Sequence, residues 1–301
     1  MRRTSGAGTR RPPGEANGVG SGRHGEGDRG ATERPARDPR APLPTRLTDL
    51  PPLPTAAADA FRAGLAAMGI ADLPPASLEA LEGHLRLLLA WTPAVNLTSI
   101  RDPETAVRDH LLDSLAAVFT LRSRGADALL DLGTGGGFPG LPLAIVLPAR
   151  RAVLVDSIAK KTAFVAVAIE AVGLGGRASA LTARAESLAA DDEHRERWPT
   201  VVARAVADLA ELAEIGLPLV RVGGCLVAWK RAPLGAELAA AAPAIDALGG
   251  GAVEVEPAHV PGREAGRLVI ITKTRPTPAR FPRAPAERAR ERRRGAPTAL
   301  S

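Results

Sequence analysis

Two patterns of apolar spacing divide this sequence into a helical part and a part in which strands and helices alternate. Between residues 55 and 124, apolar side chains recur every three or four positions, which is typical of amphipathic helices. We expect Ser77 to cap the second of these helices and Asp102-Pro103 to open the third. The predicted helices span about 60–70, 77–91 and 104–118. Together they predict a small N-terminal helical cap.

From residue 125 the pattern changes to short apolar runs separated by amphipathic helices, and it continues to residue 274. The strand candidates are 128–132, 151–156, 178–183, 200–204, 223–229, 252–257 and 267–274. Helices are predicted near 139–147, 159–172, 208–220 and 234–247. Alternating strands and helices favour a parallel sheet, while the short link through Pro261-Gly262 makes the last two strands an antiparallel hairpin. The fold class is therefore α/β, with a seven-stranded, mostly parallel, Rossmann-like sheet.

The first strand leads directly into a candidate ligand-binding loop. Gly133, Gly135 and Gly137 follow the apolar run 128–132, and glycines let the backbone turn sharply and approach a ligand closely. Asp156 ends the next strand, 23 positions after Gly133, where a parallel strand delivers an acceptor to ribose hydroxyls. This order of strand, glycine turn, helix, strand and acid predicts a site for a nucleoside cofactor.

Two glycine spacings overlap in this loop and favour different cofactors. Read from Gly135, the glycines match the Gly-x-Gly-x-x-Gly pattern of dinucleotide enzymes. That pattern would begin late and would place Pro139, which has no N–H, where a pyrophosphate needs a donor. Read from Gly133, the spacing is typical of S-adenosylmethionine enzymes, whose cofactor has no phosphate. We therefore favour S-adenosylmethionine, with an NAD-dependent oxidoreductase as the alternative.

Basic residues are concentrated at the two ends of the chain. The net charge is +6, but residues 275–301 hold eight arginines against two acids, and residues 51–274 are acidic overall. Residues 1–54 and 275–301 are rich in Pro, Gly, Arg and Ala and poor in large apolar residues, so we expect both to be disordered. The arginine run from Arg288 to Arg294 is compatible with a basic arm that attracts RNA and with an ordinary solvated tail.

Several classes of protein are disfavoured by composition. The chain has no apolar run near 18 residues and no apolar stretch after its basic start, so we expect a soluble cytoplasmic protein without a membrane span. The single Cys225 excludes an internal disulfide, and five scattered histidines predict no metal site. Nothing in the sequence indicates an obligate dimer, and we expect a monomer.

Three segments of the chain together resemble one enzyme family. They are Trp91-x-x-x-x-Asn96-Leu97-Thr98-Ser99-Ile100-Arg101-Asp102-Pro103, His110-Leu111-Leu112-Asp113-Ser114 and Asp131-Leu132-Gly133-Thr134-Gly135-Gly136-Gly137-Phe138-Pro139-Gly140. In this order they resemble the 16S rRNA (guanine-N7) methyltransferase family, RsmG, also called glucose-inhibited division protein B. The resemblance covers about residues 57–274. It implies the class I methyltransferase fold, with residues 55–124 as the cap and 125–274 as the S-adenosylmethionine-binding domain.

The resemblance implies methyl transfer from S-adenosylmethionine to N7 of the guanine at position 527 in 16S ribosomal RNA, either as RNA or in the small ribosomal subunit. Guanine N7 exposes a lone pair and loses no proton on methylation, so the reaction needs no general base. We expect the rate to come from positioning and electrostatics without a covalent intermediate. A non-catalytic RNA-binding module with the same fold is a further alternative.

The same resemblance assigns roles to individual residues. It implies that Gly133, Phe138, Ala185 and Glu186 line the cofactor and that Arg204 closes its site. The glycine spacing adds Gly135 and Asp156 to the cofactor residues. Arg204 and Lys230, at the ends of the fourth and fifth predicted strands, are the candidate catalytic residues. Glu186 is also compatible with an ordinary surface acid that follows a strand.

Polar residues of the cap are candidates for RNA binding, namely Asn96, Arg101 and His110. Each has a structural alternative, because Arg101 could fix its own loop and His110 could pair with Asp113 one helical turn later.

Two positions depart from the family pattern. The family commonly has a basic residue directly before the histidine, whereas this chain has Asp109 there and Arg108 one place earlier. Lys230 is followed by Arg231, where glycine is common.

Overall fold

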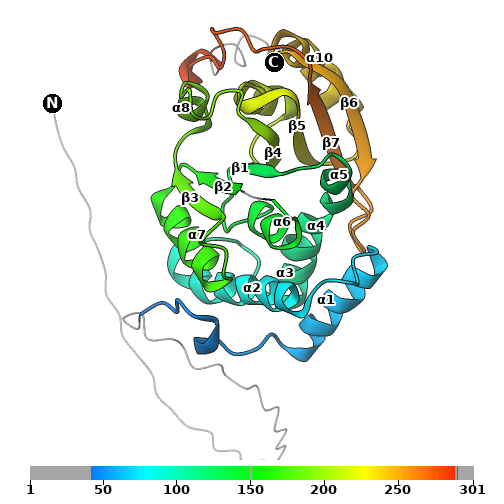
Figure 1. Cartoon of the computed structure of the whole chain (residues 1–301). Coiled ribbons are helices and arrows are strands. Elements are labelled where there is room, and N and C mark those ends of the chain that lie inside the picture. The colour runs from blue at the N-terminus through cyan, green and yellow to red at the C-terminus, as the bar shows by residue number, and fades with distance from the viewer. Residues whose placement is uncertain (1–41, 150, 289, 291–301) are drawn as a thin grey trace, which may run out of the picture. The chain divides into compact units, whose positions relative to one another are not determined.

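A seven-stranded sheet forms the centre of the computed structural model, which describes residues 42–149, 151–288 and 290 (Figure 1). The strands are β1 (Ala128–Leu132), β2 (Arg151–Asp156), β3 (Ala178–Thr182), β4 (Trp198–Arg204), β5 (Val220–Arg231), β6 (Gly250–Pro257) and β7 (Gly266–Lys273). Their order is β3-β2-β1-β4-β5-β7-β6, with β7 antiparallel to both of its neighbours and the other pairs parallel. The predicted fold class and the antiparallel hairpin are confirmed.

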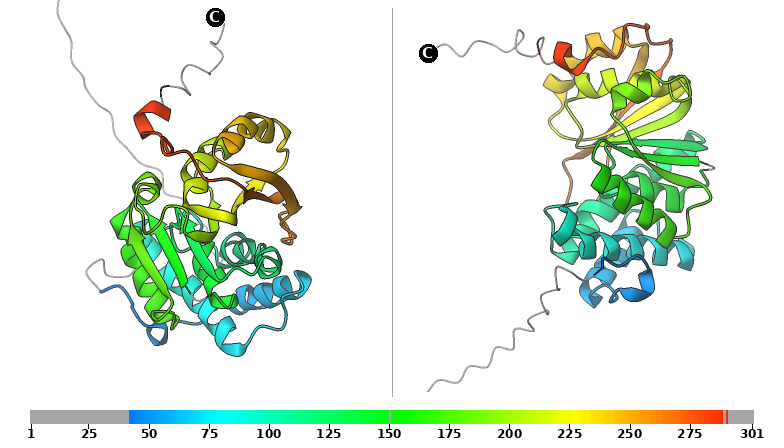
Figure 2. Two further views of the ribbon diagram at one scale, coloured as in Figure 1. Left: turned by 45° about the horizontal axis from the view of Figure 1, so that its top comes forward. Right: turned by 90° about the vertical axis from the view of Figure 1, so that its left-hand side faces the viewer.

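Helices cover both faces of this sheet, as Figures 1 and 2 show. One face carries α1 (Thr55–Ala67), α2 (Pro75–Val95), α6 (Gly140–Val146) and α7 (Ala159–Ala171), and the other carries α8 (Ala185–Ala189), α9 (Leu209–Gly216) and α10 (Gly235–Ala247). Successive strand residues alternate between the two buried clusters, since Leu154 joins the first and Val153 and Val155 join the second. Apolar residues on both faces explain why the strands are continuous apolar runs.

The cap is not a separate domain. Phe61 and Leu88 of the cap belong to the same buried cluster as Leu129 of β1 and Leu154 of β2. Residues from Pro42 onward form one compact unit. The predicted boundary at residues 124 and 125 therefore marks a change of secondary structure within one continuous core.

The predicted third cap helix, residues 104–118, is interrupted. Its segments are α3 (Pro103–Ala106), a π-helical turn (Val107–Leu112), α4 (Asp113–Leu115) and, after a break, α5 (Val118–Ser123). Side chains from distant strands bind two of its carbonyl groups. Arg204 donates to the carbonyl of Asp109 at 2.9 Å, and Trp229 donates to that of Asp113 at 2.7 Å. These donors satisfy carbonyls that a regular α-helix would bond internally, so the helix widens and then ends.

Two further helix starts differ from the predictions, and prolines explain both. α2 begins at Pro75 rather than after Ser77, because proline fixes the backbone dihedral φ for the first helical position. Pro139 lies just before α6, which begins at Gly140. The described residues also form short 3₁₀ turns at Leu47–Asp49 and Leu217–Leu219.

The prediction of disorder is wrong for residues 42–54. Leu50 and Leu53 are buried in the cluster that contains the cap helices. The indole nitrogen of Trp91 donates to the Pro44 carbonyl at 2.7 Å. This segment therefore packs against α2, while residues 1–41 of the predicted extension lie outside the described residues.

The prediction of disorder is also wrong for residues 275–288. Thr277 is buried and accepts a hydrogen bond from Nζ of Lys273 at 2.6 Å, and Arg283 forms an ion pair with the buried Glu214 at 2.6 Å. These polar contacts replace the apolar core that the composition lacks. Residues 289 and 291–301 of the predicted tail lie outside the described residues. No helix in the described part of the chain is long and apolar enough to cross a membrane.

Candidate functional site

Two cavities open where the parallel strands end, on either side of β4. The glycine-loop cavity has a volume of about 460 Å³ and is lined by residues after β1, β2 and β3, together with α9 and the C-terminal segment. The arginine cavity has a volume of about 470 Å³ and is lined by the ends of β4 and β5, the π-helical turn and the loop before β7. Residues 205–207 line both cavities, which therefore adjoin. The order of strands reverses between β1 and β4, and ligands collect at such a point in open α/β sheets.

The glycine loop between β1 and α6 is fixed by two carboxylates. The amide of Gly140 donates to Oδ2 of Asp131 at 2.9 Å, and the amide of Gly135 donates to Oδ2 of Asp156 at 3.0 Å. Asp131 is completely buried, and burial raises its pKa to about 6 against the opposing hydrogen bond from Gly140. Asp131 of β1 and Asp156 of β2 thus both hold the backbone of the loop.

The start of α6 has no N–H group left for a phosphate. Pro139 has none, the amide of Gly140 is bonded to Asp131, and the amide of Leu141 donates to the carbonyl of Gly137 at 2.8 Å. A pyrophosphate binds helix N-termini through such groups. The structure therefore disfavours the dinucleotide alternative and is compatible with a cofactor that has no phosphate.

His84 of α2 holds the glycine loop through the Gly136 carbonyl, and the sequence interpretation missed this residue. Its Nε2 atom lies 2.8 Å from the carbonyl oxygen of Gly136, and because that oxygen only accepts, Nε2 carries the proton. Burial lowers the pKa of His84 to about 4, so the ring is neutral near pH 7. The available signal was a polar residue between Leu81, Leu85 and Leu88, on the apolar face of the helix.

Phe138 lies between two histidine rings and does not line either cavity. Its ring is stacked on His84, with centroids 4.3 Å apart, and on His110, with centroids 4.9 Å apart. The guanidinium of Arg204 lies 5.6 Å from the ring centroid. The residue therefore joins the glycine loop to the cap and to β4, which differs from the expected position against the cofactor. Gly135 likewise acts through its amide and is not among the lining residues.

Four of the predicted cofactor residues do come together in the glycine-loop cavity, namely Gly133, Asp156, Ala185 and Glu186. Two partly exposed apolar side chains, Ile158 and Val206, also line it. Carboxylates that accept hydrogen bonds from hydroxyl groups, combined with apolar surface for a base, fit an adenosine group. The residues present thus fit S-adenosylmethionine.

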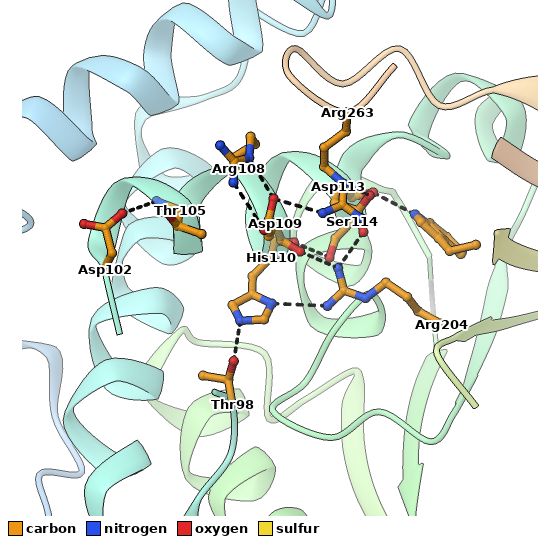
Figure 3. Close-up of polar contacts among 11 residues, drawn as sticks. Thr98, Asp102, Thr105, Arg108, Asp109, His110, Asp113, Ser114, Arg204 and Arg263 are labelled. Atoms are coloured by element: carbon orange, nitrogen blue, oxygen red, sulfur yellow. Dashed lines mark hydrogen bonds and ion pairs between the residues drawn. The ribbon is translucent and has the colours of Figure 1, made fainter. Parts of the chain in front are cut away.

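Arg204 lines the arginine cavity and contacts the cap, and Figure 3 shows it between His110 and Asp113. Its Nη1 atom lies 2.8 Å from Oδ2 of Asp113, a buried carboxylate. Nε of Arg263 lies 3.2 Å from the other oxygen of Asp113. One acid therefore holds two arginines that come from β4 and from the loop before β7.

His110 does not pair with Asp113. Its Nε2 atom lies 2.9 Å from Oγ1 of Thr98, and its Nδ1 atom lies 3.5 Å from Nη2 of Arg204. An arginine only donates, so Nδ1 is the acceptor and Nε2 carries the proton. Burial, followed by the charge of Arg204, lowers the pKa of His110 to about 4.

Lys230 lines the arginine cavity, but its ammonium group is already bonded to other groups of the protein. Its Nζ atom lies 2.6 Å from Oε1 of Glu237 and donates to the Ala207 carbonyl at 2.8 Å. The same Glu237 oxygen accepts from the amide of Leu209 at 2.8 Å. Lys230 therefore fixes the loop that separates the two cavities.

The other two cap candidates occupy loop positions. Asn96 ends α2 with a left-handed backbone, at φ 54°, and its side chain is exposed. Arg101 donates to the Thr98 carbonyl, which is the loop-fixing contact considered from sequence. Neither residue lines the arginine cavity.

Asp109, one of the two departures from the family pattern, is held by two arginines. Its Oδ1 atom lies 2.8 Å from Nε of Arg108 and 2.9 Å from Nη1 of Arg263. Sequence reasoning missed Arg263, because only the fold brings the loop before β7 against the cap. A positive group thus lies beside this position even though an acid occupies it.

Comparisons with known proteins agree with this geometry. A sequence model of the family described as GidB, rRNA small subunit methyltransferase G, matches residues 77–264. The chain belongs to this family. A ribosomal RNA small subunit methyltransferase G from Roseiflexus sp. (strain RS-1) is 47% identical over 197 residues, which cover 65% of this chain and 83% of that protein. The protein of the same name from Halalkalibacterium halodurans is 40% identical over 226 residues, which cover 75% of this chain and 94% of the relative.

A solved structure supports the fold of this family member. The O-methyltransferase from Bacillus cereus in complex with SAH matches with a TM-score of 0.50 and 17% identity, over 72% of this chain and all of that chain. The motif-based resemblance, the class I methyltransferase fold and the prediction of an S-adenosylmethionine-dependent methyltransferase are confirmed. Within the described residues, no group of three or more His, Cys, Asp or Glu side chains could hold a metal ion.

Substitution of Gly137 tests whether His84 supports the loop. Gly137 has φ +91°, and an added Cβ would lie 2.9 Å from Nε2 of His84. Gly125 has φ +62°, with no atom near an added Cβ. We expect Gly125→Ala to cost about 1 kcal/mol from backbone strain and Gly137→Ala about 1–3 kcal/mol more from the clash, measured by urea unfolding. Equal losses for the two variants would contradict the contact.

The two depressed histidine pKa values predict a specific titration. We expect His84 and His110 to stay neutral from pH 7 to about pH 5. NMR titration of the ring signals, assigned with the His84→Gln and His110→Gln variants, measures this. Unfolded histidine takes up a proton near pH 6.5, so both rings lower stability as the pH falls from 6.5 towards 4. A ring that gains charge between pH 7 and 6 would show that it is solvated.

Proposed function

We propose that this protein transfers the methyl group of S-adenosylmethionine to N7 of the guanine at position 527 in 16S ribosomal RNA. The observation that carries the proposal is the pair of adjoining cavities with different chemistry. One suits a nucleoside cofactor without phosphate, and the other is lined by an excess of basic side chains. They share residues 205–207, so groups bound in the two cavities would meet there.

The glycine-loop cavity would hold the methyl donor. S-adenosylmethionine supplies a methyl group that its sulfonium charge makes electrophilic. Asp156 would accept hydrogen bonds from ribose hydroxyl groups, while Ala185 and Glu186 would contact the adenine side. The glycine backbone, fixed by Asp131 and His84, would leave room for the cofactor close to the end of β1.

The arginine cavity would hold the nucleotide. Its lining includes five cationic side chains against two carboxylates, and the cations are Arg204, Lys230, Arg231, Arg263 and Arg267. Such an excess attracts phosphate groups and makes binding depend on salt concentration. Arg204 and Lys230 would act by fixing the position and the electrostatic field of the target base.

The hydrogen bonding of His110 agrees with chemistry at N7. Its one acceptor nitrogen faces Arg204 and its other nitrogen faces Thr98, so the ring offers no free lone pair to take a proton from the substrate. A reaction at an exocyclic amine would need a group that accepts a proton, whereas guanine N7 loses none. His110 would therefore orient Arg204 and contact RNA, with Asn96 and Arg101 nearer the rim.

The substrate would be 16S RNA or the small ribosomal subunit, and the protein would act in the cytoplasm as a monomer. Of the alternatives, a dinucleotide enzyme is opposed by the fully bonded start of α6. A non-catalytic RNA-binding module is opposed by the cavity beside the glycine loop, which pure RNA binding would not require.

Mass spectrometry of nucleosides tests the proposal directly. We expect the purified protein and S-adenosylmethionine to add one 7-methylguanosine to 16S RNA from cells that lack the protein, and cleavage mapping to locate it at position 527. Arg204→Gln should lower the rate at least about 100-fold. Arg62→Ala removes surface ion pairs with Asp59 and Glu82, lies outside the lining of both cavities, and is the matched control. Methylation of another atom, or 7-methylguanosine already present at that position, would refute the proposal.

A further inference from the structure

Residues 275–288 continue beyond the last strand and reach the glycine-loop cavity. In Figure 1 this segment, coloured orange-red to red, runs back across the molecule to α8. It lies beyond the part of the chain that matches the family, which ends at residue 264. Pro285 and Arg288, at its far end, line the cavity together with Glu186 and Glu211. We call residues 275–288 the C-terminal clasp.

The clasp is first attached through the buried Lys273. Its ammonium group lies 3.0 Å from Oε1 of Glu196 and donates to Oγ1 of Thr277 at 2.6 Å. The amide of Thr277 donates to the same carboxylate at 2.7 Å, and its hydroxyl donates to the Leu248 carbonyl at 2.8 Å. A buried amino group held by this set of partners fixes the start of the clasp.

A second attachment lies midway along the clasp. Arg283 binds both oxygens of Glu214 on α9, with Nε at 2.9 Å from Oε1 and Nη2 at 2.6 Å from Oε2. The Glu214 carboxylate is buried, and paired geometry of this kind is specific for arginine. The carbonyl of Arg283 then accepts from Nη1 of Arg288 at 2.7 Å. The second attachment therefore positions the residue at the cavity.

The third attachment lies in the wall of the glycine-loop cavity, where Arg288 contacts Glu186 and Glu211. Nη2 of Arg288 donates to Oε1 of Glu186, and Nε lies 3.7 Å from Oε1 of Glu211. The Arg288 side chain is buried, and its Nε has no hydrogen-bond partner within the described structure. Burial alone would raise the pKa of Glu186, but the hydrogen bond and charge of Arg288 outweigh it and lower that pKa. The carboxylate is thus held ionised and in one orientation.

We infer that Arg288 of the C-terminal clasp is a positioning residue of the methyl-donor site, acting through Glu186, and that the clasp forms the outer wall of that site. The inference rests on the proposed function, because it takes the glycine-loop cavity as the site of S-adenosylmethionine. The cavity keeps about 460 Å³ with the clasp in position, so the clasp lines the cavity without filling it. A wall that fixes the Glu186 carboxylate raises the affinity for the cofactor, because less side-chain conformational entropy is lost on binding.

Two truncations separate the clasp from the arginine-rich end that follows it. A chain that ends at residue 290 keeps Arg288, whereas a chain that ends at residue 284 keeps Arg283 and loses Arg288. Equilibrium dialysis with labelled S-adenosylhomocysteine should give the full-length affinity for the first and about tenfold weaker binding for the second. Arg288→Ala in the full chain should match the second, and Arg288→Lys should recover part of the loss.

A double-variant comparison distinguishes positioning from general stability. If Arg288 acts through Glu186, the Arg288→Ala substitution should weaken binding much less in a Glu186→Gln background. The KM for S-adenosylmethionine should rise with little change in kcat, and the melting temperature should not follow the affinity. Unchanged or tighter binding by Arg288→Ala would overturn the inference. Failure of the full-length chain to bind S-adenosylhomocysteine would instead refute the proposed function.

Discussion

The glycine loop after β1 is held in one conformation by hydrogen bonds that point inward, and the rest of the site depends on this constraint. Asp131, Asp156 and His84 come from three different elements, and each bonds a different peptide group of the loop. The bonds to Asp131 and Asp156 use N–H groups of the kind that a pyrophosphate would require, while His84 holds a carbonyl group. The cost of burying two acids and a histidine is offset because each has a backbone partner. The loop therefore presents a fixed backbone beside a cavity suited to a nucleoside cofactor without phosphate.

The helical cap completes the second half of the site because it shares a core with the sheet. Arg204 of β4 binds the carbonyl of Asp109 in the π-helical turn, and Trp229 of β5 binds the carbonyl of Asp113 at the start of α4. α4 in return supplies Asp113, which holds Arg204 and Arg263 at the wall of the arginine cavity. The irregular helix is thus a consequence of the contacts that Arg204 and Trp229 make with its carbonyl groups, and π-helical turns are often found at functional sites.

Much of the fold could be predicted from the sequence, because strand runs and glycine turns are local signals. The positions of Gly133, Asp156 and Arg204 follow from the rule that parallel strands end at one edge. Contacts between distant segments could not be predicted in this way. His84 lies on an apolar helix face, where the sequence alone gives it no partner. The low content of large apolar residues in 275–288 led to the prediction of a disordered tail. That interpretation failed because the segment packs through paired charges, which a measure of apolar content does not detect.

The central claim is that the fixed loop accepts a nucleoside without phosphate. Calorimetric titration of the full-length protein with S-adenosylhomocysteine and, separately, with NAD⁺ tests this claim most directly. The account predicts saturable binding of S-adenosylhomocysteine at one site per chain and no binding of NAD⁺. Binding of NAD⁺ without binding of S-adenosylhomocysteine would contradict it.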